Sequence, residues 1–129
     1  MNRTDIAWFA GFFEGEGCVR LGSQFNRNGR AYGSPVIDIC QVNKEPLDRC
    51  IKLFPHAHMY GPYQYKTNKQ PHFKFTLLGR ENVETVYNRI KEFLSLKRRE
   101  QFELAFSSHD KLKDRAKLKT GPKTRRQNV

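Results

Sequence analysis

The sequence predicts an α+β domain with two pairs of antiparallel strands, in the order helix, strand, strand, helix, strand, strand, helix. Apolar residues recur at helical spacing in three segments. Between these segments, apolar and polar residues alternate as they do in half-buried strands. A length of 129 residues suits one domain with a single core. We place this domain at residues 1–108 and a basic C-terminal tail, expected to be mobile, at residues 109–129.

The first helix carries a stripe of small residues. It is expected to begin after an N-cap at Thr4, and Ala7, Gly11 and Gly15 then fall at positions i, i+4 and i+8 on one face. Two helices can approach closely along such a stripe. The apolar run at residues 6–13 is too short to span a bilayer, so we expect a partner helix here and no membrane association.

Two acidic residues, Glu14 and Glu16, stand at the end of this helix, where the helix dipole disfavours negative charge. If the stripe pairs with a second copy of itself, the Glu16 carboxylates and the helix-terminal carbonyl groups of both copies converge. Hard divalent cations such as Mg²⁺ prefer oxygen ligands of this kind. The segment therefore predicts a metal site where the two helices meet.

The first strand pair and the second helix follow. Apolar and polar residues alternate from Val19 to Phe25, and a returning strand is expected at residues 36–42. Residues 26–30, between the two strands, have the composition of a turn. Asn43 is expected to cap a helix whose apolar stripe, from Leu47 to Phe54, lies on the sheet.

The second strand pair is expected at residues 59–65 and 72–78, and the third helix begins near Glu81. Alternation along these strands predicts a core face and an outer face. The core face would hold Tyr63, Tyr65, Phe73, Phe75 and Leu77, and the outer face Gln64, Lys66, His72, Lys74 and Thr76.

The charge of the chain predicts a polyanionic partner. Lysine and arginine number 24 against 13 acidic residues, which gives a net charge of +11 and favours nucleic acid. Three cysteines without C-x-x-C spacing predict neither a disulfide framework nor a zinc module. We expect an intracellular protein, because no signal peptide is evident. Gly121 and Pro122 are expected to interrupt any helix in the basic tail.

Two segments resemble a known family. Residues 9–17, F-A-G-F-F-E-G-E-G, resemble the nine-residue LAGLIDADG motif of homing endonucleases, with large apolar residues and two acids in matching positions. Glutamate stands where the family consensus has aspartate, which lengthens the side chain by one methylene and keeps the charge. Residues 93–102, F-L-S-L-K-R-R-E-Q-F, resemble the family segment in which an L-x-L-K stretch supplies a lysine to the active site.

The resemblance implies the αββαββα LAGLIDADG fold, in which helices back a curved, saddle-shaped antiparallel sheet. Because this chain has one motif copy, it would act as a homodimer joined through the motif helix. The implied function is that of a homing endonuclease, encoded in an intron or another mobile element. Such an enzyme cuts both strands of DNA by hydrolysing phosphodiesters, with Mg²⁺ as cofactor, at long and nearly palindromic sites.

The resemblance also implies roles for particular residues. Glu16 and the carbonyl group of Gly15 would bind the metal, and Lys97 would stabilise charge on the scissile phosphate or help to activate water. One of Gln41, Asn43 and Lys44, at the end of the second strand, would orient the attacking water, although Asn43 is also the predicted helix cap. The dimer interface would comprise Ala7, Gly11, Phe12 and Gly15.

A polar strand face suits readout of the DNA major groove, where each base pair presents a distinct pattern of donors and acceptors. The alternation of the strands, their loops and the end of the second strand supply candidate DNA contacts. These are Arg20, Gln24, Asn26, Arg27, Asn28, Arg30, Lys44, Gln64, Lys66 and Lys74.

The alternative function is a non-catalytic nucleic-acid binder of the same fold, such as a maturase whose partner is intron RNA. The joint presence of Glu16 and Lys97 favours the nuclease, because a pure binder need not keep an acid at a helix end that faces DNA. A basic ribosome-associated protein would explain the tail but not the two motifs.

Overall fold

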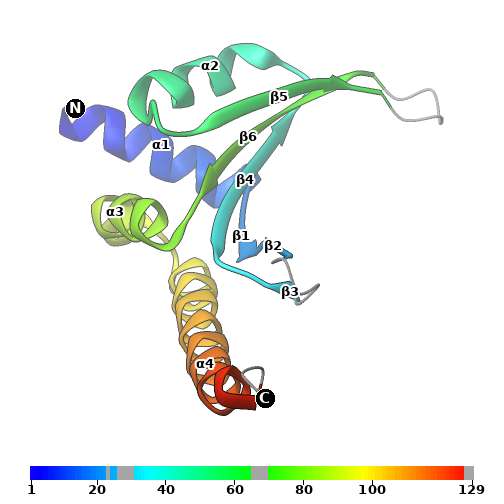
Figure 1. Cartoon of the computed structure of the whole chain (residues 1–129). Coiled ribbons are helices and arrows are strands. Elements are labelled where there is room, and N and C mark those ends of the chain that lie inside the picture. Colours follow the sequence, from blue (N-terminus) through cyan, green and yellow to red (C-terminus); the bar gives the residue numbers. More distant parts are fainter. Residues whose placement is uncertain (23, 26–30, 65–69, 127–129) are drawn as a thin grey trace.

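The computed structural model describes residues 1–22, 24–25, 31–64 and 70–126. It combines a four-stranded sheet and a short two-stranded ribbon with helices (Figure 1). In chain order, the elements are α1 (Arg3–Glu16), β1 (Gly17–Leu21), β2 (Gln24–Phe25), β3 (Ala31–Tyr32), β4 (Pro35–Gln41), α2 (Lys44–Leu53), β5 (His58–Tyr63), β6 (His72–Leu78), α3 (Arg80–Ile90), the 3₁₀ turn η1 (Lys91–Phe93) and α4 (Leu96–Arg126).

The main sheet is antiparallel, with the strand order β1-β4-β6-β5. Helices α1, α2 and α3 lie together on one face of it, whereas the opposite face is open along β4, β6 and β5 in the part of the chain that the structure describes (Figure 1). Helix α4 contacts the β1 edge and then runs away from the sheet. The predicted α+β fold class is confirmed, with the helices on one side.

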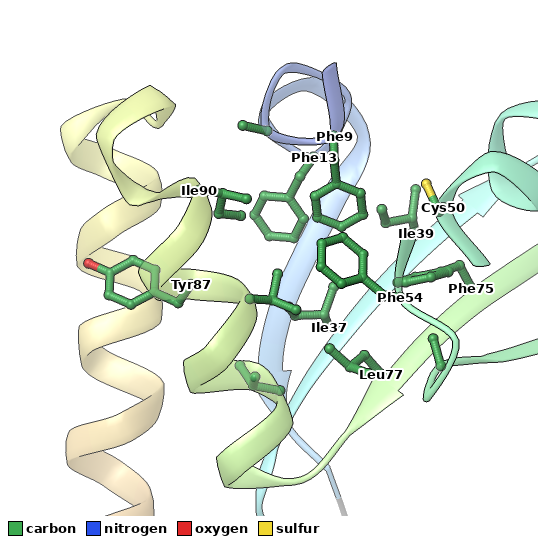
Figure 2. Packing of buried hydrophobic residues seen from close by; sticks show 14 of the residues in the cluster. Phe9, Phe13, Ile37, Ile39, Cys50, Phe54, Phe75, Leu77, Tyr87 and Ile90 are labelled. Carbon is green, nitrogen blue, oxygen red and sulfur yellow. The ribbon is translucent and has the colours of Figure 1, made fainter. Parts of the chain in front are cut away.

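The core lies between the sheet and the helices that cover it (Figure 2). Phe9 and Phe13, one helical turn apart on α1, are fully buried. They meet apolar residues that recur at every second position of the strands, such as Ile37 and Ile39 on β4 and Phe75 on β6. The helices and strands therefore turn one apolar face to this core. β4 is buried at consecutive residues from Pro35 to Ile39, so part of its other face is covered as well.

The predicted cap of the first helix is wrong, and that of the second is confirmed. Asn2, not Thr4, caps α1, because its Oδ1 accepts a hydrogen bond of 2.8 Å from the backbone N–H of Asp5. Both residues are good caps, so composition alone did not separate them. Asn43 caps α2 as predicted, with its Oδ1 accepting from the N–H of Glu45 at 3.1 Å.

The first predicted strand is interrupted. β1 ends at Leu21, and β2 belongs to a separate ribbon with β3. Gly22 and Gly33 pass close to each other at the break, where a Cβ on Gly33 would lie 2.1 Å from the carbonyl oxygen of Gly22. The two backbone segments can pass this close to each other because Gly33 has no side chain. The periodicity of the sequence does not indicate such a close approach.

The predicted helix break at Gly121 and Pro122 is also wrong, because α4 continues to Arg126. A proline removes one backbone hydrogen bond, and the structure keeps the helix through that loss. The earlier part of α4 is held by Phe102, Phe106 and His109, which are buried at helical spacing. Helix α4 thus continues past residue 108, where the domain was expected to end. That the tail at residues 109–129 is mobile stays a prediction.

The described helices were also considered as membrane spans. None of them combines the length and the apolar character that a transmembrane helix needs.

Candidate functional site

The two acids at the end of α1 lie in different environments. Glu16 is the last residue of the helix and is exposed, and among the described residues its carboxylate has no hydrogen-bond or ion-pair partner. Gly17 follows directly and begins β1. A Cβ at Gly17 would lie 2.1 Å from the Phe13 ring, so the glycine lets the chain pass from helix to strand tightly against the core.

Glu14, by contrast, joins α1 to the start of α4. Its carboxylate accepts hydrogen bonds from the backbone N–H of Ser95 at 2.7 Å and from the Ser95 hydroxyl at 2.9 Å. The backbone N–H of Ser95 lowers the pKa of Glu14 most strongly. Burial opposes this effect, and the Ser95 hydroxyl and the charge of Arg98 lower the pKa further. The guanidinium of Arg98 also donates to the Glu14 carbonyl oxygen at 3.1 and 3.0 Å. Glu14 is therefore a structural residue.

The hydrogen bonds between Glu14 and Ser95 form a joint between α1 and the start of α4, and this joint places Lys97 near the end of α1. Lys97 lies in the first turn of α4, two residues after Ser95, and Glu16 lies two residues after Glu14. Because Glu14 bonds directly to Ser95, the two sequence-predicted catalytic residues lie at one corner of the molecule. The Lys97 side chain is exposed there and forms no hydrogen bond or ion pair with the described residues.

The three candidates for orienting water are placed differently. β4 ends at Gln41, two residues beyond Ile39, whose register partner is Gly17. Gln41 therefore lies at the end of the sheet where α1 finishes. The Oδ1 atom of Asn43 is occupied in capping α2, and Lys44 forms an ion pair of 3.2 Å with Asp48 on that helix. The geometry favours Gln41 among the three.

The strand register defines the open face of the sheet. Cys18, Asp38, Thr76 and His58 stand opposite one another across the four strands, so their side chains share a face. Ile37, Ile39, Phe75 and Leu77 belong to the core on the other face. Arg20 and Lys74, at the positions that flank this row, are on the open face, where their predicted contact with DNA would place them.

The remaining candidate DNA contacts are scattered. Gln24 lies in β2, and Gln64 is exposed directly after β5. Lys44 is on α2, on the helix-covered side of the sheet, which does not agree with a contact made from the open face. Asn26, Arg27, Asn28, Arg30 and Lys66 lie outside the described residues.

Sequence reasoning missed the centre of the open face. Asp38 and Thr76 are both 6% exposed, although Thr76 was expected to face outward into solvent. The Asp38 carboxylate accepts from Arg20 Nε at 2.6 Å and from the Thr76 hydroxyl at 2.9 Å. One signal was available, because Asp38 is the only acid in an otherwise apolar strand.

Tyr63 is a further difference from the prediction. It was expected in the core but is 43% exposed. The pairing of β5 with β6 shifts register between Tyr60 and Tyr63, and such an irregularity breaks the alternation on which the prediction relied.

The dimer stripe predicted on α1 is open in the single chain. Ala7 and Phe12 are partly exposed, and Gly11 and Gly15 are exposed. A Cβ built on either glycine meets nothing within 4 Å. The packing of this chain therefore does not require glycine at these positions.

The chain was compared with known proteins by sequence and by structure. No protein-family model matches it, and a search of curated proteins finds no match. Its structure is similar to that of the homing endonuclease I-CvuI in complex with its target, with a TM-score of 0.67 and 18% identity over 88% of this chain and 71% of that one. It is also similar to the group I intron-encoded homing endonuclease I-CeuI complexed with DNA, with a TM-score of 0.66 and 13% identity.

The chain covers different shares of these proteins. The I-CeuI match spans 91% of this chain and 59% of that one. The LAGLIDADG meganuclease I-CpaMI bound to uncleaved DNA, with a TM-score of 0.65 and 17% identity, matches 92% of this chain, which spans 40% of that protein. At these identities the likeness concerns the fold. The chain has the fold of the LAGLIDADG homing endonucleases.

Proposed function

We propose that this protein is a LAGLIDADG homing endonuclease that cuts both strands of DNA at a long, pseudo-palindromic site. The observation that carries the proposal is the corner at the end of α1. There an exposed carboxylate, Glu16, lies beside the start of α4, which carries Lys97, and the bond between Glu14 and Ser95 holds the two elements together.

The proposed enzyme is a homodimer joined through α1. The sequence holds one copy of the motif, so cutting two strands would need two copies of the chain. The exposed glycines of the stripe support this assembly, because a second helix can approach the backbone there without meeting side chains. Pairing of the two stripes would bring the two Glu16 residues together.

The donor groups at this corner fit a hard divalent cation such as Mg²⁺. In each copy, Glu16 would hold the ion with its carboxylate and Gly15 with its carbonyl oxygen, and both are oxygen donors. A bound divalent ion lowers the pKa of water and stabilises charge on a phosphate. Among the described residues of one chain, no group of three metal-ligating side chains occurs. I-CvuI has been crystallised with DNA in the presence of Ca and of Mg.

The protein's own residues would divide the remaining work. Lys97 would place a positive charge beside the scissile phosphate. Gln41, at the end of β4, would orient the attacking water through its amide. The open sheet face would lie in the major groove, with Arg20, Lys74 and Gln64 as contacts to DNA, and the net charge of +11 would make binding sensitive to salt.

The test uses purified full-length protein and a randomised duplex pool with Mg²⁺, from which bound and cleaved DNA are selected separately. Wild type is expected to select one family of sites in both arms. Glu16→Gln should still bind those sites but no longer cleave them, because it removes the charge that would hold the cation. Glu81→Gln, which makes the same change at an exposed position on α3, is the control and should cleave normally.

Other outcomes would lead to a different function. Specific binding without cleavage by wild type would indicate the non-catalytic binder, and tighter binding to intron RNA than to any duplex would indicate the maturase. Cleavage that persists in Glu16→Gln would overturn the role of Glu16.

A further inference from the structure

The open face of the sheet contains a buried acid, Asp38, at its centre. A carboxylate on a surface that meets DNA is unfavourable, because it repels phosphate and must be desolvated. The Asp38 side chain is 8% exposed, and each of its oxygens is used. Oδ2 accepts from Arg20 Nε at 2.6 Å, and Oδ1 accepts from the Thr76 hydroxyl at 2.9 Å.

This arrangement fixes the orientation of the Arg20 side chain. A guanidinium group has five N–H donors in a rigid, planar fork. Only Nε is bonded to Asp38, and neither Nη atom has a hydrogen-bond partner within the described ranges. The Arg20 side chain is 45% exposed. Asp38 therefore fixes the orientation of the Arg20 guanidinium, and among the described residues nothing occupies its two Nη groups on the open face.

The N–H donors of the two Nη atoms, four in all on a fixed planar fork, match a specific pattern in the major groove. Guanine presents two acceptors there, O6 and N7, and an arginine that bonds both is the commonest specific contact with DNA. On this basis, and resting on the proposed function, we propose that Arg20 reads a guanine in each half of the target, with Asp38 and Thr76 as the residues that position it.

The charges around Arg20 favour a base over a phosphate. Asp38 compensates the positive charge of Arg20, which weakens the attraction of this side chain for an anion but leaves its hydrogen-bond donors free. A phosphate contact would be better served by an uncompensated cation, such as Lys74 on the same face. Asp38 itself does not read cytosine, because both oxygens are already bonded and the side chain is buried.

The position of Arg20 also indicates where this guanine lies. β1 begins directly after Glu16, and Arg20 lies four residues further along the chain, which at about 3.3 Å per residue is roughly 13 Å from the proposed cleavage corner. The guanine therefore belongs to the inner part of each half-site. In a homodimer the same contact occurs twice, and the target would carry the guanine at two positions related by symmetry.

The experiment measures binding and cleavage of a selected site and of every single-base variant of one half of it. Wild type should require guanine at one inner position, with a loss on the order of tenfold to a hundredfold for other bases. Arg20→Lys keeps the charge and removes the planar fork, so it should lose this preference while preferences elsewhere in the site remain. Arg89→Lys, the same change at an exposed position on α3, is the control and should retain it.

A second pair of variants separates orientation from simple contact. Thr76→Val and Asp38→Asn should weaken the guanine preference, since Arg20 is then less firmly held. Asp38→Asn should in addition raise affinity for unrelated DNA, because one negative charge is removed from the face. A merely structural role would weaken the preferences at all positions of the site and not at the guanine position alone. Thermal unfolding shows whether both variants fold. If Asp38→Asn does not fold, Thr76→Val, which is nearly isosteric, provides the test.

The results can contradict the proposal in two ways. If Arg20→Lys or Arg20→Ala lowers affinity equally for all sequences, Arg20 contacts phosphate and the inference fails while the proposed function stands. The inference also fails, and the proposed function stands, if wild type cleaves a site in which no preference for guanine depends on Arg20. If wild type binds no specific duplex, both the inference and the proposed function fail.

Discussion

The two faces of the central sheet differ although they are built from alternate residues of the same strands. On the helix-covered face, Phe75 and Ile37 are fully buried in an apolar core. On the open face, their neighbours Lys74 and Asp38 carry charge, and the buried Asp38 carboxylate is bonded on both oxygens. The covered face is expected to determine stability, and the open face to determine which partner is bound. A one-residue change of register would exchange the two, so the alternation itself is under constraint.

The largest effect on stability is expected on β6, where two adjacent residues test the contrast between the two faces. Phe75→Ala should lower the free energy of unfolding by about 3–5 kcal/mol, because it leaves a cavity in the core. Lys74→Ala, the adjacent residue on the open face, should change it by less than about 1 kcal/mol. Urea denaturation of both variants provides the measurement. Similar losses for the two would mean that the faces do not differ in this way.

The next effect concerns the joint that connects α1 to α4. Glu14→Gln should destabilise the protein at neutral pH by no more than about 1 kcal/mol, because the Glu14 side chain is 36% exposed and solvent screens its charge. The pKa of Glu14 is lowered on folding, so its contribution is present above pH 4.5 and is lost as the pH falls through the lower folded value.

Unfolding free energies at neutral pH and in steps below pH 4.5 check this prediction. Wild type should lose more stability than Glu14→Gln in that acid range. A variant with the same acid dependence as wild type would show that Glu14 is not the group responsible, and Glu81→Gln again serves as the exposed control.

Helix α1, like the sheet, has a buried face and an open face. A substitution on its open face is expected to change the folding stability only slightly but to have a large effect on assembly. Gly11 is exposed and Phe9 is buried. Gly11→Leu should stabilise the folded monomer by up to about 1 kcal/mol, because leucine favours helix over glycine. It should also prevent two α1 stripes from approaching and so abolish the proposed dimer and double-strand cleavage.

Sedimentation and unfolding measured at the same protein concentration test the Gly11 variant. Asn88→Leu adds the same side chain at an exposed position on α3 and should leave assembly unchanged. A Gly11→Leu protein that still dimerises would locate the interface elsewhere.

The smallest effect, below about 1 kcal/mol, is expected at His109, which is buried where α4 packs near Arg80. Burial lowers the pKa of His109 most strongly, and the charges of Lys113 and Arg80 lower it further. Its Nδ1 lies 3.0 Å from Arg80 Nη1, which suits a neutral ring. Stability should therefore be full above pH 6.5 and fall as the pH drops below that value.

The midpoint of thermal unfolding, measured in steps across pH 6.5, tests the role of His109. The slope just below this pH should be reduced in His109→Gln. If the slope is unchanged, another group is responsible for the acid dependence in this range.

The sequence by itself determined what depends on near neighbours along the chain. The apolar run at residues 6–13, with small residues at four-residue spacing, predicted the first helix, and Asn43 predicted the start of the second. Helical periodicity and capping involve residues at most a few positions apart, so they can be recognised locally. The LAGLIDADG fold and the roles of Glu16 and Lys97 were expected from the resemblance of residues 9–17 and 93–102 to a known family.

Tertiary structure alone decided the contacts between distant segments. The bond of Glu14 to Ser95 separates the roles of two acids that look equivalent in the motif, and the register of β1, β4 and β6 brings Arg20, Asp38 and Thr76 together. The close passage of Gly22 and Gly33 ended a strand that alternation would have continued. These features depend on which strands pair and in what register, and that is set by the packing of the whole core and not by any local pattern.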